Sequence, residues 1–458
     1  MNRRRFLKAL AATTGVALTA PGIAAAKARV NLATPAFWKL APTPPMGWNS
    51  YDTYGSDVTE SEYLANAAVM QKTLLHHGYN YAIIDYLWFD PTLAPQGIAH
   101  PGPSAMDAYG RMLPAVNKFP SAAHGRGFRP LSEKIMGMGL KFGFHVMRGI
   151  PREAVAKNTP IEGSHFHARD AANTKDICSW DNHMVGVRGA TAAGQAYYDS
   201  IMRLYHQWNA SFLKIDDLSR PYHEAEIHAI RRAMNHFLPK AVLSASPGAT
   251  PVDKAVDISH NANMWRIRDD FWDNWGELDN MFDLVAAWKG FAGPGHWPDC
   301  DMICLGRIGL RSVGGPRFTH FTMDEQRTLM SLWALAPSPL ILGMNLTQLD
   351  PWTLSLIANP AALAISQDIL GAQGARVSAA GPLEVWAKPL HHGALAVGLF
   401  NRGNNNNAVV TAKWSDLTLR GPHRVLDVWG HRALKPANGS LAMQVSGHGA
   451  RLLRLERA

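Results

Sequence analysis

Eight short apolar runs alternate with helical stretches between about residue 44 and residue 370, and this alternation limits the folds open to the chain. The stretches between the runs, such as residues 61–76 and 223–235, place apolar side chains at helical spacing. The expected strands are residues 46–49, 79–86, 140–147, 211–216, 241–246, 264–267, 296–302 and 339–344. Eight strand–helix units predict an α/β fold, a (β/α)8 barrel of the TIM type. A doubly wound sheet is the alternative, but no glycine-rich phosphate loop follows the first run.

The pattern changes after residue 370. Short alternating runs at residues 383–388, 394–400, 408–412 and 423–428 are separated by turn residues. This spacing predicts an antiparallel β domain over residues 371–458, which would follow a barrel over residues 27–370.

The N-terminus has the form of an export signal. A basic start contains, in order, Arg3, Arg4, Arg5, Phe6, Leu7 and Lys8. An apolar stretch follows, and residues 24–26, all alanine, offer a small-residue cleavage site. The pattern predicts a twin-arginine signal peptide over residues 1–26 and therefore a periplasmic or secreted protein. Because the apolar stretch is short for a membrane span, no membrane association is expected after the signal is removed.

Composition excludes several classes of partner. The formal net charge is +9, and about +5 remains without the leader cations, spread along the chain with no basic run. Nucleic acid is therefore not an expected partner.

Cys178, Cys300 and Cys304 allow at most one disulfide, and the sequence does not choose the pair. No histidine and carboxylate cluster has metal-site spacing, so neither a catalytic metal nor a cofactor is expected. The oligomeric state is left open.

Charged residues gather where the predicted strands end. Lys214, Asp216 and Asp217 end the run that starts at residue 211, and about fifty residues later Arg266 is followed by Asp269 and Asp270. Buried charges must be paired or used, and barrel active sites lie at the carboxyl ends of the strands. Two carboxylates about 5–5.5 Å apart, one a nucleophile and one an acid/base, are what a retaining glycosidase requires. The pattern favours that chemistry.

Seven motifs, in order along the chain, resemble those of one family. They are TPPMGWNS at 43–50, YAIID at 81–85, LKID at 213–216, WRIRDD at 265–270, GPGHWPDCDM at 293–302, SQDILG at 366–371 and EVW at 384–386. Together they are similar to the α-galactosidase and α-N-acetylgalactosaminidase family of retaining glycosidases, the melibiases. The resemblance implies a (β/α)8 barrel followed by a C-terminal β-sandwich, and an oligosaccharide or polysaccharide substrate.

The resemblance also implies roles for individual residues. Asp216 matches the family nucleophile, and Asp270 matches the acid/base. Five further residues match family positions that hydrogen-bond the sugar or line its pocket: Trp48, Asp85, Lys214, Arg266 and Asp301.

Other positions depart from the family pattern, and we expect them to contact the substrate. Tyr86 follows Asp85 where α-galactosidases have a second acid, and Tyr51 replaces a tryptophan. His145, followed by Arg148, replaces a tyrosine, and the loop at Ser246 lacks a glutamate. The expected activity is that of an α-galactosidase. The alternatives are the same mechanism on a β-L-arabinopyranoside (the same ring lacking C6) or an α-glucan, and a non-catalytic glycan-binding barrel.

Overall fold

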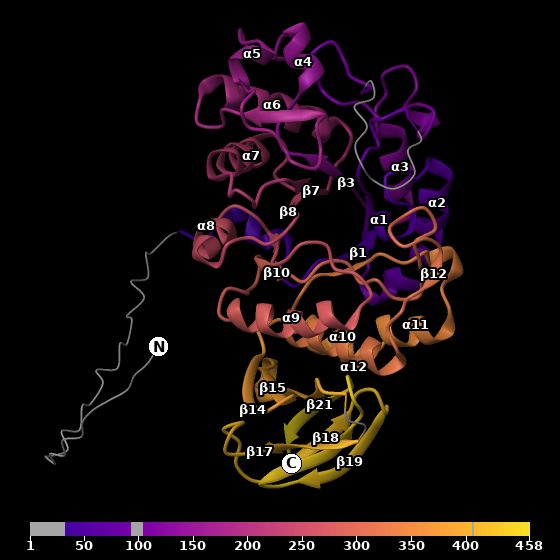
Figure 1. Cartoon of the computed structure of the whole chain (residues 1–458), viewed down its shortest axis with the longest axis vertical. Helices are drawn as coiled ribbons and strands as arrows, with labels where there is room; N and C mark the ends of the chain where they lie inside the picture. The colour runs from indigo at the N-terminus through magenta and orange to yellow at the C-terminus, as the bar shows by residue number, and fades with distance from the viewer. Residues whose placement is uncertain (1–32, 93–103, 405–406) are drawn as a thin grey trace, which may run out of the picture. The chain divides into compact units, whose positions relative to one another are not determined.

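A curled sheet of eight parallel strands forms the centre of the region before residue 371 (Figure 1). The computed structural model describes residues 33–92, 104–404 and 407–458. The strand order is β10-β9-β8-β7-β3-β2-β1-β13, and a parallel bridge between Ile303 and Leu342 joins the two ends. The strands are β1 (Met46–Asn49), β2 (Tyr81–Ile84), β3 (Lys141–Met147), β7 (Phe212–Asp216), β8 (Val242–Ala245), β9 (Met264–Arg266), β10 (Trp297–Asp299) and β13 (Leu340–Leu342). The predicted barrel is confirmed.

Helices connect these strands and cover the outside of the barrel. They are α2 (Glu60–Val69), α3 (Arg129–Gly137), α6 (Ala192–Gln207), α7 (Glu224–Phe237), α8 (Ala255–Ser259), α9 (Trp275–Ala287) and α10 (Met323–Leu335), with α11 (Pro351–Ile357) and α12 (Pro360–Ser366) after β13. Two of them begin with a capping box, Thr59 with Glu62 and Thr322 with Glu325, which satisfies the exposed N–H groups of the first turn.

Strands β1, β3 and β7 end at the predicted residues, and the other five barrel strands end earlier than predicted. Strand β2 ends at Ile84, so Asp85 and Tyr86 lie just beyond it, and β10 covers three residues of the predicted 296–302. Close packing of the strands is visible at Gly47, where an added Cβ would lie 2.3 Å from the carbonyl oxygen of Tyr81. Strands β1 and β2 can therefore pair at this point only because residue 47 has no side chain.

A small antiparallel sheet is inserted between β3 and α6, and the sequence did not predict it. It contains β4 (Ile150–Pro151), β5 (Ala172–Asn173) and β6 (Met184–Val187), with the short helices α4 (Arg152–Lys157) and α5 (Ala168–Ala171) between the first two strands. Strands of two residues have too little alternation to be recognised in a sequence. The connection from β5 to β6 carries residues to the mouth of the barrel.

The C-terminal region is an antiparallel β-sandwich, as predicted. One sheet has the order β14-β15-β16-β21-β18-β19, and β17 pairs with β20 in the other. The strands are β14 (Ala375–Ala380), β15 (Leu383–Pro389), β16 (Leu395–Asn401), β17 (Ala408–Lys413), β18 (His423–Asp427), β19 (Arg432–Ala437), β20 (Ser440–Val445) and β21 (Ala450–Arg457). Val397 and Leu453 of the larger sheet share an apolar core with Val410 and Val445 of the smaller one.

Polar contacts join the sandwich to the barrel. The side-chain nitrogen of Lys388, on β15, is fully buried and donates to the carbonyl oxygens of Ala334 and Ile365 at 3.0 and 2.6 Å. Burial lowers the pKa of Lys388 to about 7. Arg402 donates to Asp279 of α9 at 2.6 Å. Lys388 therefore reaches the last turns of α10 and α12, where helix carbonyls need donors.

Three predictions concern cysteines, membranes and export. Cys178, Cys300 and Cys304 are buried thiols, and no disulfide joins them. Within the described residues, no helix has both the length and the apolar character needed to cross a membrane. The predicted signal peptide, residues 1–26, lies outside the described residues, so export stays a prediction.

Candidate active site

A cavity of about 280 Å³ opens at the carboxyl ends of the barrel strands. Its inner part is formed by side chains from the ends of β1, β2 and β7, and its outer part by loops that follow β5, β7, β8 and β9. The inner residues are Tyr51, Asp85, Tyr86, Lys214 and Asp216; the outer residues are Trp180, Arg220, Pro247, Asp269 and Asp270.

An ion pair between Lys214 and Asp85 lies in the inner part. The Lys214 Nζ is 2.9 Å from Asp85 Oδ2, and the same oxygen accepts a hydrogen bond of 2.6 Å from Asn49 Nδ2. Burial alone would raise the pKa of Asp85, but the Lys214 ammonium opposes it and holds that pKa at about 2. The site therefore presents a fixed carboxylate and a fixed ammonium, which together can accept from and donate to vicinal hydroxyl groups.

Asp216 ends β7 and shares a strand face with Lys214, two residues earlier. Its Oδ2 lies 2.9 Å from Nε2 of His145, which projects from the neighbouring strand β3 and is fully buried. Burial would raise the pKa of Asp216, but His145 and then Lys214 oppose it and hold the pKa below its usual value. Asp216 is thus an ionised, buried carboxylate at the side of the cavity, the state that a nucleophile needs.

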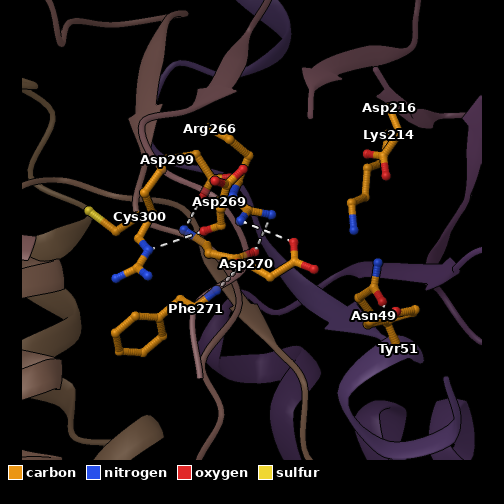
Figure 2. A network of polar contacts seen from close by, with 12 residues as sticks. Asn49, Tyr51, Lys214, Asp216, Arg266, Asp269, Asp270, Phe271, Asp299 and Cys300 are labelled. Atoms are coloured by element: carbon orange, nitrogen blue, oxygen red, sulfur yellow. Dashed lines mark hydrogen bonds and ion pairs between the residues drawn. The ribbon is translucent and has the colours of Figure 1, made fainter. Parts of the chain in front are cut away.

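Asp270 lies across the cavity, on the loop after β9. Its Oδ1 accepts a hydrogen bond of 3.4 Å from Nη2 of Arg266, and 54% of its side chain is exposed. Figure 2 shows its carboxylate directed into the space that Lys214 and Tyr51 enter from the other side. Asp270 can therefore exchange protons with solvent and with a group bound in the cavity.

A buried carboxyl group, Asp301, holds the loop that carries Asp270. Its Oδ2 accepts a hydrogen bond of 2.7 Å from the backbone N–H of Phe271, and its Oδ1 is 2.7 Å from Nη1 of Arg266. Burial, aided by the charges of Asp270 and Asp299 and opposed by Arg266, raises the pKa of Asp301 to about 7. Asp301 acts on the cavity through Asp270 and Arg266, which it keeps in place.

Comparison with known proteins decides the family. Residues 181–368 match the family described as "Alpha galactosidase A". Residues 380–455 match the family described as "Alpha galactosidase C-terminal beta sandwich domain". The β-L-arabinopyranosidase of Geobacillus stearothermophilus is 44% identical, with a TM-score of 0.90 over 93% of this chain and 99% of that one. This chain is a melibiase. It belongs to glycoside hydrolase family 27, and it is a glycosidase with a sugar substrate.

Two further relatives show how wide the melibiase likeness is. The α-galactosidase of Cyamopsis tetragonoloba is 28% identical over 426 residues, which cover 90% of this chain and 86% of that protein. The α-galactosidase I of Mortierella vinacea shares the fold, with a TM-score of 0.72 at 24% identity over 92% of this chain and 98% of that one.

The predicted site residues of this melibiase fall into three groups. Six of them line the cavity: Tyr51, Asp85, Tyr86, Lys214, Asp216 and Asp270. A second group lies just beneath or behind it, with His145 against Asp216, and Ser246, Arg266 and Asp301 around a narrow space inside the barrel. The remaining two, Trp48 and Arg148, are not among the described residues that line either space.

Trp48 faces the helices rather than the cavity. It is fully buried, donates from Nε1 to the carbonyl oxygen of Met344 at 2.8 Å, and packs against Tyr63 of α2. Its neighbour Asn49, on the opposite face of β1, reaches Asp85 instead. The structure therefore gives no support to a pocket-wall role for Trp48.

Arg148 lies behind β7 in a buried ion network. Its guanidinium pairs with Asp176, Asp217 and Glu226 at 2.9, 2.7 and 2.6 Å. Its backbone N–H donates to the carbonyl oxygen of Asp216 at 3.0 Å, and its Nε donates to that of Asp217 at 2.8 Å. Arg148 thus holds the two backbone carbonyls that follow the Asp216 side chain, and the structure gives no support to direct contact with the sugar.

Two acidic clusters in this melibiase have the spacing of metal sites. In the first, Asp176, His223 and Glu226 lie together, but Arg148 already pairs with both carboxylates. In the second, Glu224 pairs with Lys254, and Asp257 accepts hydrogen bonds from other side chains. Neither arrangement calls for a metal ion in the site.

Sequence reasoning missed several residues in the cavity or in contact with its lining. Asn49, which hydrogen-bonds Asp85, lies inside a motif at a strand end, and that position was a usable signal. Trp180, in the lining, and Asp181, which binds Tyr86, come from the connection between β5 and β6, where the sequence has no strand or helix pattern. Asp269 lies inside the WRIRDD motif and Arg220 soon after the LKID motif, but the sequence does not indicate that they meet. In the structure they pair across the mouth of the cavity.

Proposed function

We propose that this melibiase is a retaining β-L-arabinopyranosidase. The observation that carries the proposal is the position of Tyr86 in the inner part of the cavity, beside Asp85. α-Galactosidases resembling this chain have a second acid there, which grips hydroxyls of the galactose ring. β-L-Arabinopyranose has the same ring without C6 and its hydroxyl, so it needs less room at that end.

Tyr86 is held rigidly. Its hydroxyl donates to Asp181 Oδ2 at 2.7 Å, and its ring contacts those of His145 and Trp180 at centroid distances of 5.4 and 5.8 Å. Only 4% of the residue is exposed. A ring that cannot swing away occupies room that a C6 substituent would need, and its hydroxyl is already used by Asp181. Steric exclusion and the missing acceptor both favour the pentose.

The likeness to other proteins supports the same choice. The 44% identical relative named β-L-arabinopyranosidase covers nearly the whole chain, and a variant of that relative is described in complex with arabinose. The curated relatives named α-galactosidase are 28% identical or less. The α-galactosidase activity expected from the motifs is therefore the second candidate. It is kept because the Asp85 and Lys214 pair can bind hydroxyl groups of either sugar.

The proposed reaction proceeds in two displacements. Asp216 attacks the anomeric carbon while Asp270 donates its proton to the leaving oxygen, so the glycosidic bond breaks as the glycosyl–Asp216 bond forms. Asp270, now ionised, takes a proton from water, and that water displaces Asp216 and restores the original anomeric configuration. Asp85 and Lys214 hold ring hydroxyls through both steps.

A pair of substrates that differ only at C6 tests the proposal. We expect wild-type kcat/KM for p-nitrophenyl β-L-arabinopyranoside to exceed that for p-nitrophenyl α-D-galactopyranoside by more than about tenfold. Tyr86→Phe keeps the ring and should keep the preference, whereas Tyr86→Asp opens the space and should reduce it. Asp216→Ala should abolish turnover of both. A wild-type enzyme that prefers the galactoside would contradict the proposal.

A further inference from the structure

The outer part of the cavity carries an exposed aromatic ring whose position the proposed reaction does not explain. Trp180 lines the mouth with 39% of its surface exposed, although tryptophan is usually well buried. Its ring lies 5.8 Å from that of Tyr86, tilted by 59°. One edge of the indole is therefore fixed against the inner pocket while part of its surface is open to a ligand.

An ion pair lies on the same rim. Arg220, from the loop after β7, contacts the carboxylate of Asp269, from the loop after β9, and more than half of each side chain is exposed. A guanidinium has five N–H donors, and this contact uses the Nη2 group. The pair therefore offers hydrogen-bond donors and acceptors at the mouth, and it connects the loop of the nucleophile to that of the acid/base.

The chemistry of glycoside cleavage fixes what occupies this rim. The departing oxygen must meet Asp270, because the acid/base protonates it. Asp270 lies in the outer part of the cavity with Trp180, Arg220 and Asp269, and the sugar that is cleaved off occupies the inner part. The group attached to the departing oxygen therefore extends over these three side chains.

We infer that Trp180, Arg220 and Asp269 form a binding subsite for a neutral pyranose ring on the leaving-group side. Flat aromatic faces bind the apolar face of a sugar ring, and the ion pair binds its hydroxyls. Because Arg220 and Asp269 neutralise each other and Asp270 adds a carboxylate, the rim has no excess positive charge to favour an acidic sugar. The inference rests on the proposed function for the sugar that is cleaved, and it adds which residues bind the next ring of the substrate and that this ring is neutral.

The loop after β8 supports this rim. An added Cβ at Gly248 would lie 1.4 Å from the carbonyl oxygen of Arg268, so the loop bearing Pro247 packs directly on the backbone just before Asp269. Residue 248 must therefore be glycine for the rim to keep its shape.

Two substrates with one glycone and different leaving groups test the subsite. A glycosyl fluoride loses a single atom that cannot reach Trp180, whereas a disaccharide loses a whole ring. Because the Trp180 ring also contacts Tyr86, its loss can affect both substrates, and we expect Trp180→Ala to lower kcat/KM for the disaccharide roughly tenfold more than for the fluoride. Trp180→Phe should restore most of the disaccharide activity. Tyr109→Ala removes another exposed aromatic, 38% exposed and absent from the cavity lining, and should change neither substrate.

The outcomes separate this inference from the proposed function. Both substrates carry the glycone that the wild-type enzyme cleaves best. If that glycone is galactose, the proposed function is contradicted, but the comparison of fluoride and disaccharide still tests the subsite. Equal losses on fluoride and disaccharide, or no loss on the disaccharide, would overturn the subsite. A salt-sensitive preference for a uronate leaving group would overturn its neutral character.

Discussion

Replacing Arg148 with methionine is the change whose consequences the structure specifies most fully. The Arg148 side chain is 2% exposed and pairs with three carboxylates, of which Glu226 and Asp217 are also buried. Removing one partner of a buried ion pair costs about 3–5 kcal/mol, because charges remain in a poor solvent. We expect Arg148→Met to lose stability in this range at pH 7. The three pairs do not add, because the stranded carboxyl groups can take up protons.

The pH dependence of that loss identifies its cause. Burial raises the pKa of Asp217 and of Glu226 even in the presence of Arg148, and without the guanidinium both would rise further. A carboxyl group with a raised folded-state pKa stabilises the fold below its unfolded pKa, and that contribution is lost as pH rises through the folded value. The deficit of Arg148→Met should therefore be largest near neutral pH and shrink towards pH 4.

Urea unfolding followed by tryptophan fluorescence at pH 5 and pH 7 measures the deficit. Arg203→Met is a matched control, because Arg203 is one-third exposed and its contact with Glu162 should contribute less than about 1 kcal/mol. Arg148 also holds the backbone carbonyls of Asp216 and Asp217, so kcat should fall, and Arg148→Lys should recover part of both properties. A deficit below about 1 kcal/mol, or one unchanged between the two pH values, would refute the reasoning.

Two further predictions concern the reacting carboxylates. His145 opposes the effect of burial and lowers the pKa of Asp216, so His145→Ala should raise that pKa. The acidic limb of the plot of kcat/KM against pH should therefore move to higher pH. A limb that does not move would show that His145 does not set the ionisation of Asp216. Asp270→Gly removes the proposed acid/base and should reduce kcat about 10²–10⁴-fold on a poor leaving group. On a dinitrophenyl glycoside, azide should restore turnover of this variant and yield a glycosyl azide of retained configuration, and absence of that product would argue against Asp270 as the acid/base.

The barrel was predictable because each of its strands is a short apolar run that ends in polar residues. The inner site followed from the same pattern, since Lys214 and Asp216 are two residues apart and must share a face. The position of Trp48 was not predictable, for a physical reason. Strands of a parallel barrel are buried on both faces, so an apolar pattern does not tell which side chains point inward. Only the pairing of the strands and the packing of α2 decide that Asn49 reaches Asp85 while Trp48 packs against Tyr63. Arg148 follows β3, and its ion pairs are made with residues distant in the sequence.

The outer site could not be read from the sequence, because it is made by loops. Trp180 reaches the cavity through an inserted sheet whose strands are two to four residues long. Arg220 and Asp269 are 49 positions apart, and their contact depends on how two loops cross the mouth. The proposed leaving-group subsite thus consists of the residues that local patterns describe least.

The position of Lys388 makes the β-sandwich a structural part of the enzyme. Its side-chain nitrogen donates hydrogen bonds to carbonyl oxygens in the last turns of α10 and α12, which are helices of the barrel. A barrel produced without residues 371–458 would expose these helix ends to water and lose the donor that caps them both. Homologous enzymes that exchange their C-terminal domains would therefore have to exchange this lysine and its two acceptor turns together, which limits how freely the sandwich can be recombined.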